Sequence, residues 1–196
     1  MKRVLALDVA MNRTGWAFGL SAPDTRPTHG VFETQNWEGN EGKNLHRLRR
    51  WLDEKFKTAT HIAMEQIFVD VRGADSKAFN FGGTEGQMMQ AGVVAEWAES
   101  MGMPVFWINC DDWRRRFLGL NRKPKEHRSE KLYWKNLALK VAAQRGWFCE
   151  FHDEAEALGI LDYTLAQLDL GYRDRTNVHL NKQHVDQIQG RGLHAR

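Results

Sequence analysis

The order of its hydrophobic segments is the feature that most constrains the fold of this chain. Residues 3–8 read as a short buried strand, a second run covers 14–20 after a polar turn, and a third strand is expected near 29–34. Runs of strand length joined by turns predict β-hairpins. Two more such runs, at 61–68 and 104–109, alternate with segments of helical spacing. This order predicts an α/β fold with a mixed central five-stranded sheet flanked by helices.

The segments between and after these strands carry apolar residues at helical spacing. We expect helices after Asn44, over 88–100, over 113–118, after a cap at Ser129, and from Asp153 to Leu170. The glycine-rich stretch at 69–87 is expected to be a mobile loop. Residues 171–196 are polar and lack hydrophobic periodicity, so we expect one domain at 1–170 and a flexible basic tail at 171–196.

The overall composition limits the class of protein. With 196 residues, 42% of them hydrophobic, the chain can build the core of one globular domain. It contains no run of 18 apolar residues and no leader-like N-terminus, so we expect a cytoplasmic protein without a membrane span. The two cysteines, Cys110 and Cys149, show no zinc-site spacing. Reduced thiols are therefore expected, and any metal is expected to bind oxygen ligands.

Basic residues are concentrated in one part of the chain. Residues 113–147 contain eleven Lys or Arg and two acids, a net charge of +9 in a chain whose total is +3. The remainder therefore carries −6. A basic band on an acidic body attracts polyanions and is typical of nucleic-acid-binding proteins. The alternative is an ordinary solvated basic helix.

Acidic residues stand out at three places in the predicted elements. Asp8 ends the first strand, Glu65 interrupts the strand at 61–68, and Asp153 and Glu156 share one face at the start of the last helix. Each has an ordinary explanation, namely an Asx turn, an exposed strand position or a helix cap. A pair of carboxylates at the rim of a core is unfavourable, because of desolvation and mutual repulsion, unless a cation binds it. The alternative is a metal site shared by the three segments.

Three segments in this order, LALDVAMNRTGWA, AMEQIF and DEAEAL, resemble the acidic blocks of the RuvC-type Holliday junction resolvases. The first matches at Asp8, Thr14 and Gly15, the second over 63–68 and the third over 153–158. The resemblance implies the ribonuclease H-like fold of that family. It spans most of residues 4–168 but is dense only in these blocks.

The chain departs from the family pattern at two points. The family's Asp-Pro-Gly-Ser turn is replaced by Asp8, Val9, Ala10 and Met11, and Glu156 stands where Asp is usual. Both changes are chemically tolerable, since Glu adds one methylene group. With these changes and the long segment after residue 68, the chain resembles a phage or prophage member of the family more than the compact cellular enzymes.

The resemblance implies a catalytic site of four acids that binds two Mg²⁺ ions, for which Mn²⁺ is expected to substitute. It assigns Asp8 as the bridging ligand, Glu65 to one metal, and Asp153 and Glu156 to the other. Magnesium prefers oxygen ligands, which agrees with this set. His152 lies beside the acids in the sequence and is either a proton-transfer group or an ordinary surface residue.

The resemblance also implies four-way branched DNA as the substrate and a homodimer as the active form, because two symmetric nicks need two active sites. Phe68 matches the family's base-stacking aromatic residue, and its alternative role is core packing. Lys131 is the main candidate phosphate contact, with Lys125, Arg128 and Lys135 behind it.

Three other classes of protein remain in view. A ribonuclease H-like nuclease acting on flaps, branched DNA or hybrids would carry similar acids. A catalytically inactive branched-DNA-binding protein would not need all four acids. An actin-like or sugar-kinase ATPase also begins with an acidic strand and a glycine-containing hairpin, but its second lobe scarcely fits within 196 residues.

Overall fold

The computed structural model describes residues 1–22, 25–34, 39–67, 81–120 and 130–176, with side chains left undescribed at 81–83 and 130–131. Five strands form one sheet in the order β3-β2-β1-β4-β5. β1 pairs antiparallel with β2 and β2 with β3, whereas β4 runs parallel to β1 and β5 parallel to β4. The predicted mixed five-stranded sheet is confirmed. Its strands are β1 (Arg3–Asp8), β2 (Arg13–Leu20), β3 (Thr28–Glu33), β4 (His61–Glu65) and β5 (Val105–Ile108).

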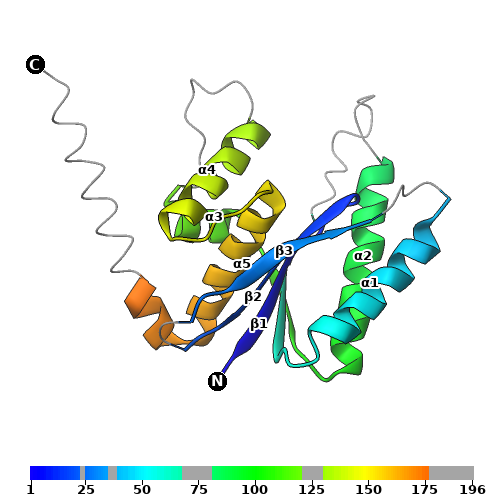
Figure 1. The fold of residues 1–196 in the computed structure, drawn as a ribbon, viewed down its shortest axis with the longest axis horizontal. Coiled ribbons are helices and arrows are strands. Elements are labelled where there is room, and N and C mark those ends of the chain that lie inside the picture. Colours follow the sequence, from blue (N-terminus) through cyan, green and yellow to red (C-terminus); the bar gives the residue numbers. More distant parts are fainter. Residues whose placement is uncertain (23–24, 35–38, 68–80, 121–129, 177–196) are drawn as a thin grey trace, which may run out of the picture.

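Five helices cover the two faces of the sheet (Figure 1). They are α1 (Glu41–Lys55), α2 (Phe81–Ser100), α3 (Cys110–Leu118), α4 (Glu130–Gln144) and α5 (His152–Leu168). α1 and α2 lie on one face, and α3, α4 and α5 lie on the other. Among the described helices, none has the length and apolar character needed to cross a bilayer.

The central strand β1 supplies side chains to both cores because successive residues of a strand face opposite sides. Val4 and Ala6 are fully buried against the α3–α5 layer, and Leu5 and Leu7 are fully buried against the α1–α2 layer. Continuing this alternation puts Asp8 on the α5 side. The two-sided burial explains why residues 4–7 form a continuous apolar run within this strand.

Several expected boundaries were wrong: α1 begins at Glu41 instead of after Asn44, and two larger differences concern α2 and β4. α2 begins at Phe81, so residues 81–87 are helical where the glycine-rich composition indicated a loop; residues 69–80 lie outside the described part. Tertiary contacts explain the difference, since Gln87 Nε2 in this first part of α2 donates a hydrogen bond to the Val9 carbonyl (3.1 Å). β4 ends at Glu65 instead of continuing to 68.

A buried carboxylate ties together the layer that contains α5. Asp162 of α5 is fully buried and forms ion pairs with Arg116 Nε of α3 (3.0 Å) and Arg145 Nη1, just after α4 (2.9 Å). Tyr172, within a helical segment at 170–176, donates its hydroxyl to the same carboxylate (3.1 Å). A buried charge with these partners is compensated, whereas one left alone would be strongly destabilising. The first residues of the expected tail therefore contact the domain, and residues 177–196 lie outside the described part.

Candidate active site

Two of the four acids lie at the ends of adjacent parallel strands. Leu7 of β1 pairs with Met64 of β4, so the next residues, Asp8 and Glu65, end their strands at the same edge. Ala63 packs in the α3–α5 core, and the twofold alternation places Glu65 on that same face. Strand pairing alone thus brings together two carboxylates that are 57 positions apart in the sequence.

The other two acids come from the first turns of α5, which lies directly against β2 at Gly15. A β-carbon built at Gly15 would lie only 1.9 Å from the Asp153 carbonyl oxygen, so no larger residue fits this contact. Gly15 is also the pairing partner of Asp8 across β1 and β2. The Thr-Gly pair noticed in the sequence therefore has a physical role, because the glycine lets the start of α5 approach the strand that ends in Asp8.

The carboxylates of Asp8, Asp153 and Glu156 converge. Each offers a ligand atom, and these atoms all lie within 4.8 Å of one another. Glu65 does not belong to this tight group, but its charge contributes to raising the pKa of both Asp8 and Glu156. The Glu65 carboxylate accepts a hydrogen bond from Trp113 Nε1 of α3 (2.7 Å). The structure therefore places the four predicted acids at one edge of the sheet, three of them in direct proximity.

The electrostatics of this cluster disfavour its ionised form in the absence of a cation. Burial raises the pKa of Asp8 well above its ordinary value, and the charges of Glu156, Glu65 and Asp153 raise it further. Burial also raises the pKa values of Glu156 and Glu65. Like-charged carboxylates that are removed from water favour protonation or a bound cation. The all-oxygen donor set fits a hard divalent cation such as Mg²⁺.

Lys135 of α4 faces the acids. Its Nζ lies 3.2 Å from Asp153 Oδ1 and 4.0 Å from Glu156 Oε2. The ammonium group lowers the pKa of Asp8 and Glu156, against the effect of burial. The sequence had suggested Lys135 only as a phosphate contact within the basic band, and nothing in its local pattern indicated contact with the acids.

The remaining predicted DNA contacts lie largely outside the described residues. Phe68, Lys125 and Arg128 fall in the undescribed segments, and Lys131 is part of α4 but its side chain is not described. His152 is the first residue of α5 and is half-buried.

The turn after Asp8 is held by a glutamine that sequence reasoning missed. Gln90 of α2 is fully buried, and its Nε2 donates hydrogen bonds to the carbonyls of Ala10 (3.1 Å) and Met11 (3.2 Å). Its Oε1 accepts a hydrogen bond from the buried Thr14 hydroxyl (3.1 Å). These contacts hold the turn between β1 and β2 in place. The only signal in the sequence was the spacing of Gln87 and Gln90, which lie on one helical face.

Trp113 is a second residue whose role was missed. It is fully buried, and its ring lies against the bare backbone of Gly159 in α5, where a β-carbon would come within 2.6 Å of the ring. This contact orients the indole N–H that binds Glu65. The sequence indicated only a short helix beginning at this tryptophan.

The sheet order, with antiparallel strands β1–β3 and parallel strands β4 and β5, defines a ribonuclease H-like fold. Within that class the structure is similar to solved Holliday junction resolvases. The structure of RuvC from Thermus thermophilus superimposes with a TM-score of 0.58 at 13% identity, covering 89% of this chain and 96% of that chain.

Two further solved structures show the same likeness. T. thermophilus RuvC in complex with a Holliday junction substrate gives a TM-score of 0.56 at 15% identity, covering 82% of this chain and 90% of that one. The yeast mitochondrial Holliday junction resolvase Ydc2 gives 0.51 at 18% identity, covering 81% and 75%. No protein-family model and no curated protein sequence matches the chain. The RuvC-like fold expected from the three acidic blocks is confirmed.

Proposed function

We propose that this protein is a metal-dependent endonuclease that resolves four-way DNA junctions by hydrolysing phosphodiester bonds. The observation that carries the proposal is the convergence of Asp8, Asp153 and Glu156, with ligand atoms within 4.8 Å of one another, beside Glu65. A cluster of acids from three distant segments, each with a share in raising the pKa of Asp8, is a costly arrangement that a bound cation would relieve. The similarity of the fold to solved Holliday junction resolvases also supports the proposal.

The four acids are the proposed metal ligands. Asp8 would bridge two Mg²⁺ ions, Glu65 would hold one, and Asp153 with Glu156 would hold the other; Mn²⁺ would substitute. When held there, two such ions would supply an activated water and stabilisation of the charge at phosphorus and on the leaving oxygen. The residues themselves supply position, because Gly15, Trp113 and Gln90 fix the strands and helices that carry the acids.

Lys135 has a proposed part in substrate binding. Its ammonium group compensates the acids in the absence of metal, through Asp153 at 3.2 Å. A phosphate brought to the same acids would meet this cation directly, and charge-assisted hydrogen bonds to phosphate are among the stronger polar contacts. Lys125, Arg128 and Lys131 are proposed to extend the positive surface along the DNA backbone, and Phe68 is proposed to stack on bases at the crossover.

The substrate and the assembly follow from the class of reaction. One of the similar structures is described as RuvC in complex with a Holliday junction substrate, which supports branched DNA as the substrate here. Two symmetric nicks require two active sites, so we propose a homodimer. A cytoplasmic location stays a prediction.

The direct test is cleavage of labelled four-way junction, duplex and flap DNA, with Mg²⁺ and with a chelator. We expect paired nicks in the junction, little cutting of duplex, and none with chelator. Equal cutting of all three substrates would contradict junction specificity and favour a less selective ribonuclease H-like nuclease. Cleavage in chelator would contradict the role of the acids, and binding without cleavage under every metal condition would indicate an inactive DNA-binding protein.

A further inference from the structure

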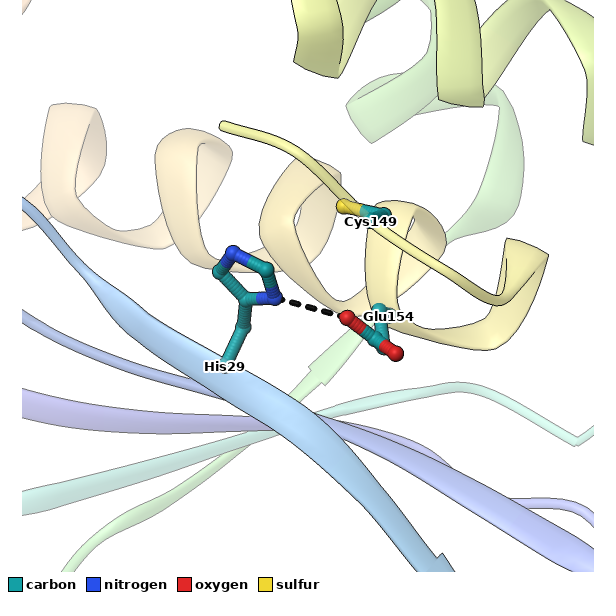
Figure 2. A group of neighbouring side chains, drawn as sticks. All are labelled: His29, Cys149 and Glu154. Atoms are coloured by element: carbon teal, nitrogen blue, oxygen red, sulfur yellow. Dashed lines mark hydrogen bonds and ion pairs between the residues drawn. The ribbon is translucent and has the colours of Figure 1, made fainter. Parts of the chain in front are cut away.

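A second group of metal-ligating side chains lies apart from the acid cluster. His29 of β3, Cys149 in the segment before α5 and Glu154 of α5 point toward one another between the strand and the helix (Figure 2). One ligand atom from each lies within 4.8 Å of the other two. His29 Nδ1 and Glu154 Oε2 are 2.8 Å apart. Residues separated by up to 125 positions therefore meet only in the folded chain.

The position of Glu154 is unusual for an ordinary helix-start acid. The residue is only 6% exposed, on the opposite side of the helix start from the proposed catalytic acids, and its ion-pair partner is the 17%-exposed His29. A buried carboxylate is costly unless a cation or several hydrogen bonds compensate it. The half-buried Cys149 thiol adds a soft ligand at the same point. Burial, with the Glu154 charge, raises the pKa of this thiol to about 12.

We propose that His29, Cys149 and Glu154 bind one Zn²⁺, or a similar borderline transition-metal ion, at a site separate from the proposed Mg²⁺ ligands. Nitrogen, sulfur and oxygen donors in one set favour zinc over magnesium, which takes oxygen ligands almost alone. On binding, the Cys149 proton passes to solvent and the thiolate, imidazole and carboxylate each donate an electron pair. Water completes a four-coordinate site.

The geometry requires only small movements. Tetrahedral zinc with bonds of about 2.0–2.3 Å holds its ligand atoms about 3.3–3.8 Å apart. The His29–Glu154 pair at 2.8 Å must open by about half an ångström, and a pair that includes the Cys149 sulfur, about 3.5 Å wide on zinc, must close by at most about 1.3 Å.

A metal at this site would join three parts of the chain. It would fasten β3 and the segment containing Cys149 to the first turn of α5, directly beside Asp153. The inference does not depend on nuclease activity, because it rests on the donor set alone.

Cobalt substitution tests the proposal, since a Co²⁺–thiolate bond absorbs in the near ultraviolet and Co²⁺ bound to carboxylates alone does not. The full chain is stripped of metal and titrated with Co²⁺ in an excess of Mg²⁺, which competes for the all-oxygen site. We expect one equivalent of thiolate-bound cobalt per chain. Cys149→Ser should abolish the band and Cys110→Ser should retain it, because the chain has two cysteines. His29→Ala should weaken Co²⁺ binding by at least about tenfold.

Circular dichroism identifies variants that do not fold. A second measurement, alkylation of the two cysteines, uses the unmodified chain and therefore does not depend on the folding of any variant. Zn²⁺ should protect Cys149 from alkylation while Cys110 continues to react. Peptide mass spectrometry measures the alkylation of each cysteine. The absence of a thiolate band in the unmodified chain, a band that persists in Cys149→Ser, or equal alkylation of Cys149 with and without Zn²⁺ would each overturn the proposal. None of these outcomes bears on Mg²⁺-dependent cleavage, which is measured separately.

Discussion

Gly15→Ala is the most direct perturbation of the proposed active site that leaves every acid in place. The added β-carbon would lie 1.9 Å from the Asp153 carbonyl oxygen and 2.2 Å from its carbonyl carbon. Side-chain β-carbons essentially never approach a neighbour within 3.0 Å. The first turn of α5 must therefore move away from β2 by about 1.1 Å, the difference between 3.0 and 1.9 Å. This backbone contact cannot be relieved by a side-chain rotation.

The shift has two measurable consequences. Overpacking of a closely packed contact costs about 1–3 kcal/mol of the free energy of unfolding. A displacement of about 1 Å in a catalytic constellation lowers the rate by about 100-fold. We therefore expect Gly15→Ala to remain folded under mild conditions but to cut junctions about 100-fold more slowly, because Asp153 and Glu156 move relative to Asp8.

Gly19→Ala is the matched control, since it lies on the same strand and also faces α5. Its β-carbon would meet Leu161 Cδ2 at 2.9 Å, the flexible end of a side chain that can rotate away. Urea denaturation and single-turnover cleavage with Mg²⁺ should show a much smaller loss for this variant. A Gly15→Ala protein that unfolds and cuts like the unmodified chain would refute the argument that this glycine sets the position of α5.

Three further predictions concern the acids and the ammonium group of Lys135. Asp8→Asn should bind four-way junctions in a gel-shift assay but cut them at least about 100-fold more slowly, because a direct metal ligand is lost; cutting at a normal rate would show that Asp8 is not a ligand. In chelator, the raised pKa of Asp8 and Glu156 means that the folded chain binds more protons than the unfolded chain above about pH 4. Their contribution to stability is therefore present at low pH and lost as the pH rises through the raised values, so urea midpoints should favour Asp8→Asn over the unmodified chain at neutral pH; the reverse order would contradict the sign. Lys135→Met should raise the pKa of Asp8 and Glu156 further, because their nearby ammonium group is lost. It should slow cleavage by about tenfold and reduce the salt dependence of DNA binding. An unchanged cleavage rate together with an unchanged salt dependence would exclude Lys135 from the site.

The parts of the fold with strong local periodicity could be predicted from the sequence. Residues 3–8 are buried on both faces, so their apolar run marks the central strand regardless of context. The acids were found because Asp8 and Glu65 interrupt or end apolar strands, where a charge is conspicuous. Gly15 was identified only through the resemblance to a family motif. The physical need for glycine there is the close approach of α5, which depends on packing and has no local signal in the sequence.

The parts set by contacts between distant segments could not be predicted. The start of α2 was missed because its glycine-rich composition favours a loop, while Gln87 and Gln90 gain hydrogen bonds to the β1–β2 turn only in the folded chain. The prediction that any metal would bind oxygen rested on the absence of zinc-like spacing. A ligand set drawn from His29, Cys149 and Glu154 has no local signature, because a strand, a connecting segment and a helix each supply one member.

The ion pairs around Asp162 bear on how this protein could be redesigned. The helix that presents Lys135 and the helix that presents the acids are joined by two ion pairs, Lys135 with Asp153 and Arg145, just after α4, with Asp162. A redesign that replaces α4 should therefore end before Arg145, because its loss would remove one of the cations that compensate the fully buried Asp162 carboxylate.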